Sequence, residues 1–148
     1  MSDTSPAATA ERLTRRRARM MPVLALFLFI QQTAFFTRSE IMRTVDIVRT
    51  SGWLLFAAVV LAALLTGGLW FKRREVRELM DDEVTRANRA NALTAGFAVA
   101  MGAGILLYGA ESFAPDTFSA REAIHLVVSV GLATALLRFG MLERRAIG

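Results

Sequence analysis

Few residues in this chain have the types and spacing that chemistry requires, and the clearest pair is Glu122 and His125. They stand at positions i and i+3, which places both side chains on one face of a helix. Glu-x-x-His is the spacing found in di-iron carboxylate bundles, but those sites add a second such pair and two further glutamates. Because His125 is the only histidine, the pair predicts at most a mononuclear metal or ligand site completed by an acid of another loop. The alternative is a histidine hydrogen-bonded near a membrane surface.

Other catalytic arrangements find little support. The chain contains no cysteine, which excludes disulfides, thiol catalysis and thiolate metal sites. Ser112, Ser119 and Ser129 have no base or orienting group at a recognisable spacing, and no glycine-rich phosphate loop occurs. We therefore expect a protein that is not an enzyme and that carries no cofactor.

The elements that must position these residues are membrane-spanning helices. Of the 148 residues, 54% are hydrophobic, and they lie in long blocks instead of alternating with polar residues. About 18 to 20 apolar residues cross a bilayer as a helix. Four blocks qualify as predicted spans, the first of them short and able to cross if it tilts little. They comprise residues 21–36, 53–71, 92–110 and 123–140.

The distribution of positive charge predicts the orientation of these spans. If successive spans cross the membrane in alternating directions, the segments on one side hold 14 Lys and Arg residues and those on the other side hold 4. Cytoplasmic loops carry the excess of Lys and Arg, so both termini and the charged segment 72–91 are expected in the cytoplasm. The net charge of +5 indicates attraction to anionic lipid instead of nucleic-acid binding, because no polar segment is long enough to fold into a basic face.

The chain divides into a leader and a membrane domain. Residues 1–19 are polar and basic, and we expect a disordered cytoplasmic leader followed by a membrane domain over residues 20–148. The leader resembles the start of a signal peptide, but bulky Phe35 and Phe36 stand where a signal peptidase needs small residues. An uncleaved anchor in the bacterial inner membrane is therefore predicted.

Between the first two spans, residues 37–51 have apolar side chains at helical spacing and charged ones mostly opposite. This pattern predicts a short amphipathic helix at the outer interface, acting either as a packing element or as a lid. The expected architecture is thus an all-α, integral membrane four-helix bundle with one additional interfacial helix.

Small residues recur every four positions in the last two spans, at Gly96, Ala100 and Gly104 and at Gly131 and Ala135. Such stripes let helix backbones approach closely in lipid. The contacts could form within one chain or between protomers, and we expect a homo-oligomer.

A transporter or channel is the alternative function, formed by a homo-oligomer. The predicted spans contain no ionisable residue deep in the membrane, where a proton-coupled transporter would need one. Small multidrug exporters carry a glutamate in their first span, whereas this first span offers Gln31 and Gln32. A polar pathway would therefore use Gln31, Gln32, Asn91 and Thr94. The same side chains could instead form hydrogen bonds between helices.

The charged segment 72–91 contains the start of the third helix. Carboxylates at Asp81, Asp82 and Glu83 precede a run of helix-forming residues, and negative charge favours a helix N-terminus. A helix from about Asp82 to Ala110 would place polar residues at a spacing of three along one face, which is either solvated, in contact with another helix, or used to dock a partner. These residues are Thr85, Asn88, Asn91 and Thr94.

The stretch from Asp82 to Arg89, followed by a span rich in glycine and alanine, resembles small four-span bacterial inner-membrane proteins of uncharacterised function. Those proteins have an Asp-Glu-x-Thr motif before their third span and are often encoded beside small helix-turn-helix regulators. The resemblance covers about half of the chain, from Arg73 to Arg145. It implies a cytoplasmic contact surface at Asp82, Glu83, Thr85 and Arg86, and it brings no catalytic residues.

We therefore expect a non-catalytic, membrane-anchored interaction or regulatory subunit that acts through the segment 72–91. Its expected partners are the lipid bilayer and a cytoplasmic protein. The predicted partner-binding residues are Asp82, Glu83, Thr85, Arg86, Asn88 and Arg89.

Overall fold

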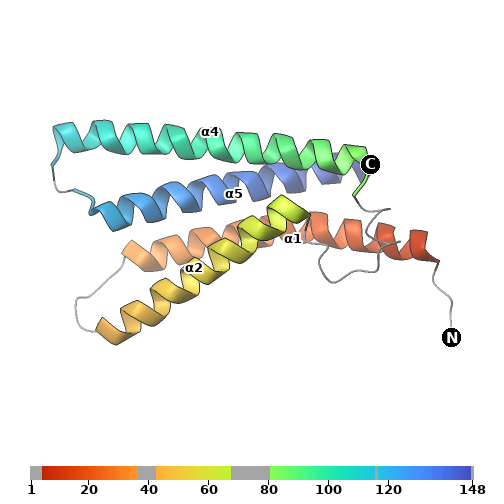
Figure 1. The fold of residues 1–148 in the computed structure, drawn as a ribbon, viewed down its shortest axis with the longest axis horizontal. Coiled ribbons are helices and arrows are strands. Elements are labelled where there is room, and N and C mark those ends of the chain that lie inside the picture. The colour runs from red at the N-terminus through yellow and green to blue at the C-terminus, as the bar shows by residue number, and fades with distance from the viewer. Residues whose placement is uncertain (1–4, 37–42, 68–80, 116, 148) are drawn as a thin grey trace.

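The computed structural model describes residues 5–36, 43–67, 81–115 and 117–147. This part of the chain is all-α (Figure 1) and contains helices α1 (Pro6–Phe36), α2 (Arg43–Thr66), α4 (Glu83–Phe113) and α5 (Ala120–Ile147). Within it, 3 helical stretches are long and apolar enough to cross a membrane: Ile47–Thr66, Glu83–Phe113 and Ala120–Ala146. The predicted all-α fold is confirmed, and three of its helices could cross a membrane by length and composition. Four spans and the orientation stay predictions. Helix α1 is not among the three stretches found within the described residues.

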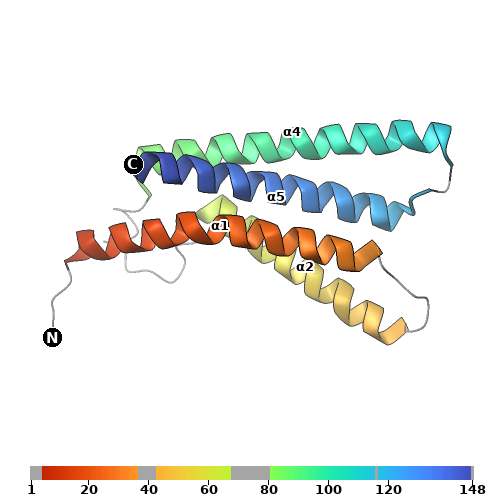
Figure 2. The same ribbon diagram turned by 180° about the vertical axis from the view of Figure 1, so that it is seen from behind.

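Helix α5 is the central element of the fold. It packs against α1, α2 and α4, and Figures 1 and 2 show α1, α4 and α5 lying along a common axis while α2 crosses them at an incline. Helix α1 begins and α5 ends at the same end of the molecule (Figure 1). We call this the ion-pair end, because Arg17 and Glu143 meet there. The opposite end, which holds Trp53 and His125, is the pocket end.

Helix α1 begins earlier than the sequence predicts, which corrects the expectation of a disordered leader for residues 6–19. The Ser5 hydroxyl accepts a hydrogen bond from the Ala8 amide at 3.3 Å, as an N-cap residue does. Ala10 and Ala18 are buried. Capping and packing thus extend α1 backwards through the basic stretch.

Helix α2 also differs from the prediction. Residues 43–51 form its first turns and continue into the apolar stretch without a break, so within residues 43–66 there is no separate amphipathic helix. Gly52 lies inside this helix, where glycine costs only about 1 kcal/mol relative to alanine and does not force a break. Residues 37–42, the rest of the predicted amphipathic helix, lie outside the described residues. The helix ends at Thr66, and Gly67 follows with a φ of 76°, a left-handed conformation that favours glycine.

The small-residue stripes of α4 and α5 face each other within one chain. A Cβ atom added at Gly96 would stand 2.7 Å from the carbonyl oxygen of Gly131 and 2.8 Å from the Cβ of Ala135. One added at Gly131 would stand 2.8 Å from the Cβ of Ala100. The predicted helix contact is confirmed, and it is intramolecular. The homo-oligomer stays a prediction that these stripes no longer support.

Helix α1 packs on the other side of α5 through a core of aliphatic and aromatic side chains. Leu28 of α1 is buried together with Leu136 and Phe139 of α5. Phe27 of α1 also meets Phe56 of α2 edge to face, with ring centroids 5.0 Å apart. These contacts fix α1 and α2 relative to α5, which carries polar side chains at both of its ends.

Candidate functional site

The start of α4 is fixed by a side-chain cap. The Asp82 carboxylate accepts a hydrogen bond from the Thr85 amide at 2.7 Å, and Glu83 is the first helical residue. The predicted helix start near Asp82 is confirmed. Thr85 is 6% exposed, so its side chain faces the interior of the bundle and not a partner.

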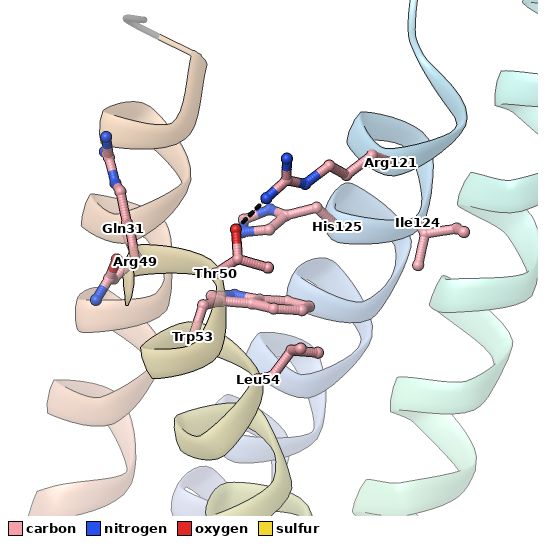
Figure 3. Close-up of a pocket in the computed structure, with 8 residues that line it drawn as sticks. All are labelled: Gln31, Arg49, Thr50, Trp53, Leu54, Arg121, Ile124 and His125. Carbon is pink, nitrogen blue, oxygen red and sulfur yellow. Dashed lines mark hydrogen bonds between the residues drawn. The ribbon is translucent and has the colours of Figure 1, made fainter. Parts of the chain in front are cut away.

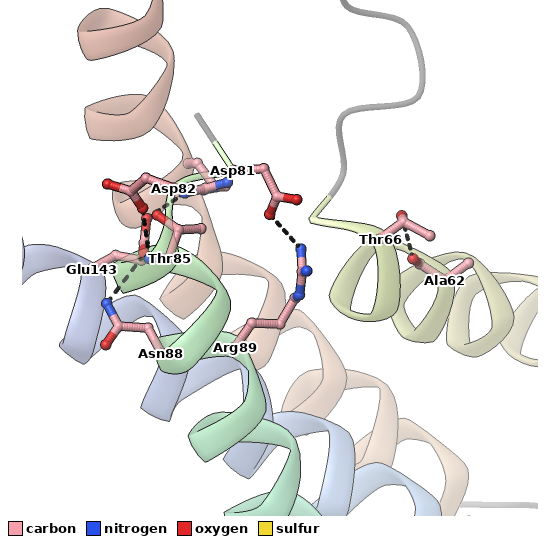
Figure 4. A network of polar contacts seen from close by, with 9 residues as sticks. Ala62, Thr66, Asp81, Asp82, Thr85, Asn88, Arg89 and Glu143 are labelled. Carbon is pink, nitrogen blue, oxygen red and sulfur yellow. Dashed lines mark hydrogen bonds and ion pairs between the residues drawn. The ribbon is translucent and has the colours of Figure 1, made fainter. Parts of the chain in front are cut away.

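Three helices meet in a buried polar network at the ion-pair end. Glu143 of α5 forms an ion pair with Arg17 of α1. It also accepts a hydrogen bond of 3.4 Å from the side-chain Nδ2 of Asn88 in α4. The Arg17 guanidinium carbon lies 5.3 Å from the ring centroid of Phe139. Figure 4 shows Glu143 and Asn88 beside the Asp82 cap. The network therefore holds the first turns of α4 against α5, which the ion pair joins to α1.

Sequence reasoning missed Arg17 and Glu143. Arg17 stands among four other arginines of the leader, and Glu143 precedes Arg144 and Arg145, so both look like members of solvated charge clusters. Only the packing of α1 along α5 distinguishes them, since their side chains are 9% and 2% exposed.

The six predicted partner-binding residues fall into two groups. Arg89 pairs with Asp81 at 3.2 Å (Figure 4), and Asp82, Thr85 and Asn88 make the internal contacts described above. Glu83 and Arg86 are exposed. Four of the six residues therefore position the helix, and two point their charges outwards.

The four residues of the predicted polar pathway are not brought together in a single chain. Asn91 accepts a hydrogen bond of 3.0 Å from Arg138, and the Thr94 hydroxyl donates to the carbonyl of Ala90 at 3.0 Å. Gln31 instead lies at the pocket end with His125. Residues 125 and 138 of α5 are roughly 20 Å apart at about 1.5 Å per residue. The pathway stays a prediction for an assembly of chains.

Gln32, the neighbour of Gln31, is half-buried on α1. Both polar atoms of its amide are buried and find no hydrogen-bond partner among the described residues. It therefore makes no interhelical hydrogen bond with them.

At the pocket end, Glu122 caps α5. Its carboxylate accepts hydrogen bonds from the Ser119 amide and hydroxyl, both at 2.8 Å, and the Ser119 hydroxyl accepts one from the Glu122 amide at 3.3 Å. This is a capping box, whose Ser-x-x-Glu signature is visible in the sequence. The carboxylate proposed as a metal ligand thus has a structural partner.

His125 is 6% exposed and stacks on Trp53 of α2, with ring centroids 4.2 Å apart and an angle of 28° between the rings. No group of three or more potential metal-ligating side chains occurs within the described residues. Asp116, one acid of the adjoining loop, lies outside them. Trp53 is 8% exposed and therefore packs between helices.

Beside this aromatic pair is a cavity of about 350 Å³ between α1, α2 and α5. Trp53, Leu54 and Ile124 give it mostly apolar walls. In Figure 3 Arg121 lies above His125, and the Trp53 ring lies below both His125 and Thr50. Arg121 donates a hydrogen bond to the Thr50 hydroxyl and so links α5 to α2. The lining residues are Gln31, Arg49, Thr50, Trp53, Leu54, Arg121, Ile124 and His125.

Comparison of the chain with protein-family models, with curated proteins and with solved structures gave no match. The resemblance of residues 82–89 to four-span bacterial membrane proteins therefore stays a prediction, and function must be argued from the geometry alone.

Proposed function

We propose that the chain is a non-catalytic, multi-pass protein of the bacterial inner membrane that presents the start of α4 to a cytoplasmic protein partner. The observation that supports this is that the two faces of the first two turns of α4 differ. Thr85 and Asn88 face inwards, while Glu83 and Arg86 are exposed. A helix end that is fixed on one side and charged on the other is a preorganised surface, which reduces the entropy lost on binding.

The charge pattern sets the chemistry of the partner. Glu83 and Arg86 stand three residues apart, so a partner needs one basic and one acidic group at a matching spacing. Such complementary charges select a partner and speed its encounter more than they add affinity. In this proposal α1 also spans the membrane, in addition to α2, α4 and α5. Both termini then lie in the cytoplasm, and the Arg17–Glu143 pair lies near the inner membrane surface.

Site-specific photocrosslinking in cells tests the proposal. A photoreactive residue replacing Val84, which is 55% exposed beside Glu83 and Arg86, should give a protein adduct. One replacing Leu106, which is 75% exposed on the apolar part of α4, should give only lipid adducts. With the photoreactive residue at Val84, the charge reversal Glu83→Arg should abolish the protein adduct.

Arg144→Glu is the matched control, because Arg144 is an exposed arginine of α5 at the same end of the molecule. It should leave the adduct unchanged. An adduct that persists after both Glu83→Arg and Arg86→Glu would refute the assignment of these two residues as the contact.

A further inference from the structure

We propose that the cavity at the pocket end binds the phosphate group of an anionic phospholipid. This inference does not rest on the proposed function, since it concerns the opposite end of the molecule. It starts from the cavity between α1, α2 and α5, whose volume of about 350 Å³ falls in the range of small-molecule sites.

The charge of the lining selects the ligand. Among the described residues that line the cavity, two are arginines, Arg49 and Arg121, and none is acidic. Guanidinium groups bind phosphate and carboxylate with paired, charge-assisted hydrogen bonds. The two arginines come from different helices, α2 and α5, so one anion between them would tie the inclined α2 to the central helix.

A buried donor in the wall of the cavity is a second, independent observation. The indole Nε1 of Trp53 is buried and has no hydrogen-bond partner within the described part of the chain, although the residue is only 8% exposed. A buried donor without a partner costs about 1–3 kcal/mol. A phosphate oxygen in the cavity would accept this hydrogen bond and remove the cost.

The depth and the walls of the cavity indicate a lipid as the source of the phosphate. Arg49 and Arg121 stand near the N-terminal ends of α2 and α5, a few residues before the apolar stretches of these helices. If these helices span the membrane, this is the level of the lipid head groups. Leu54 and Ile124 are 56% and 63% exposed, and both line the same cavity. Acyl chains can follow these side chains into the bilayer while the phosphate stays between the arginines.

Trp53 provides the readout for a test with the full chain in neutral detergent. Replacing the only other tryptophan, Trp70, by Phe leaves Trp53 as the single indole. Titration with a short-chain phosphatidylglycerol should change its emission in a saturable way. Phosphatidylcholine, whose choline group repels arginine, and inorganic phosphate, which has no acyl chains, should bind at least about tenfold more weakly.

Substitutions at the arginines identify the site. Arg49→Gln and Arg121→Gln should each weaken phosphatidylglycerol binding by about tenfold, and Arg121→Lys should retain part of it. Arg145→Gln, at the opposite end, should have no effect. Native mass spectrometry of the same variants counts retained lipid, and circular dichroism checks that each remains helical.

Three results would overturn the proposal. Equal responses to phosphatidylglycerol and phosphatidylcholine would exclude charge selection, and an equal response to inorganic phosphate would exclude a lipid as the source. Unchanged titrations for folded Arg49→Gln and Arg121→Gln would exclude this cavity.

Discussion

Arg17 of α1 and Glu143 of α5 form a buried ion pair between positions 126 residues apart. Their side chains are 9% and 2% exposed, so both charges have left water. An isolated charge in such a place is costly, and pairing offsets part of that cost. Glu143 gains a further hydrogen bond from Asn88, whereas Nε and Nη1 of Arg17 have no hydrogen-bond partner among the described residues. The pair therefore ties α1 to α5 more specifically than the surrounding apolar contacts do.

Removing one partner of this pair should destabilise the bundle strongly. Glu143→Ala leaves the Arg17 guanidinium buried without its carboxylate, and the expected loss is about 3–5 kcal/mol in the free energy of unfolding. Equilibrium unfolding in mixed micelles measures it. The double variant Arg17→Met with Glu143→Leu should lose much less, because it buries no unpaired charge. A loss equal to that of Glu143→Ala would show that the pair is not the cause.

The contact between α4 and α5 predicts a sharp difference between two glycines of the same helix. Gly96→Ala places a Cβ 2.7 Å from the carbonyl oxygen of Gly131 and should force the helices apart, at a cost of about 1–3 kcal/mol. Gly102→Ala meets nothing within 4 Å and should cost nothing. The same unfolding assay compares them, and similar losses at both positions would contradict the packing.

At the N-cap of α4, asparagine should replace Asp82 with little loss of stability, whereas alanine should not. Asp82→Ala removes the acceptor of the Thr85 amide and should cost about 1 kcal/mol, whereas Asp82→Asn should retain most of the stability. Hydrogen exchange of the Thr85 amide should be accelerated in the alanine variant alone. Slow exchange at Thr85 in Asp82→Ala would mean that another group satisfies this amide.

The absence of cysteine makes the proposed topology directly testable. A single cysteine replacing Ser112, which is exposed at the end of α4, should react with a membrane-impermeant thiol reagent applied to spheroplasts. A cysteine replacing the exposed Arg145 should react only after the membrane is permeabilised. The reverse pattern would invert the orientation, and labelling of both from outside would refute a shared cytoplasmic location of the ion-pair end.

The sequence predicts well what depends on local pattern. The apolar blocks locate the cores of α2, α4 and α5, the carboxylates before Thr85 locate the start of α4, and the glycine stripe locates the face that meets α5. The capping box from Ser119 to Glu122 was equally local and readable. All of these signals act within a few turns of one helix.

What the sequence could not provide is the pairing of distant positions. Nothing distinguishes Arg17 from its neighbouring arginines until α1 packs along α5, and nothing brings Trp53 to His125 until α2 crosses α5. The helical extension before Met20 was not predicted for the same reason. Its sequence is mostly polar and basic, and its alanines Ala10 and Ala18 become buried only when α1 packs in the bundle.

The central position of α5 has a consequence for how the protein is made. Helices α1, α2 and α4 precede α5 in the chain, and each packs against α5. Until α5 follows, Arg17 lacks its carboxylate and Gly96 lacks its contacts with Gly131 and Ala135. The packing of the bundle can therefore be completed only after α5 has been synthesised, and a chain that stops before residue 143 lacks the ion-pair partner of Arg17.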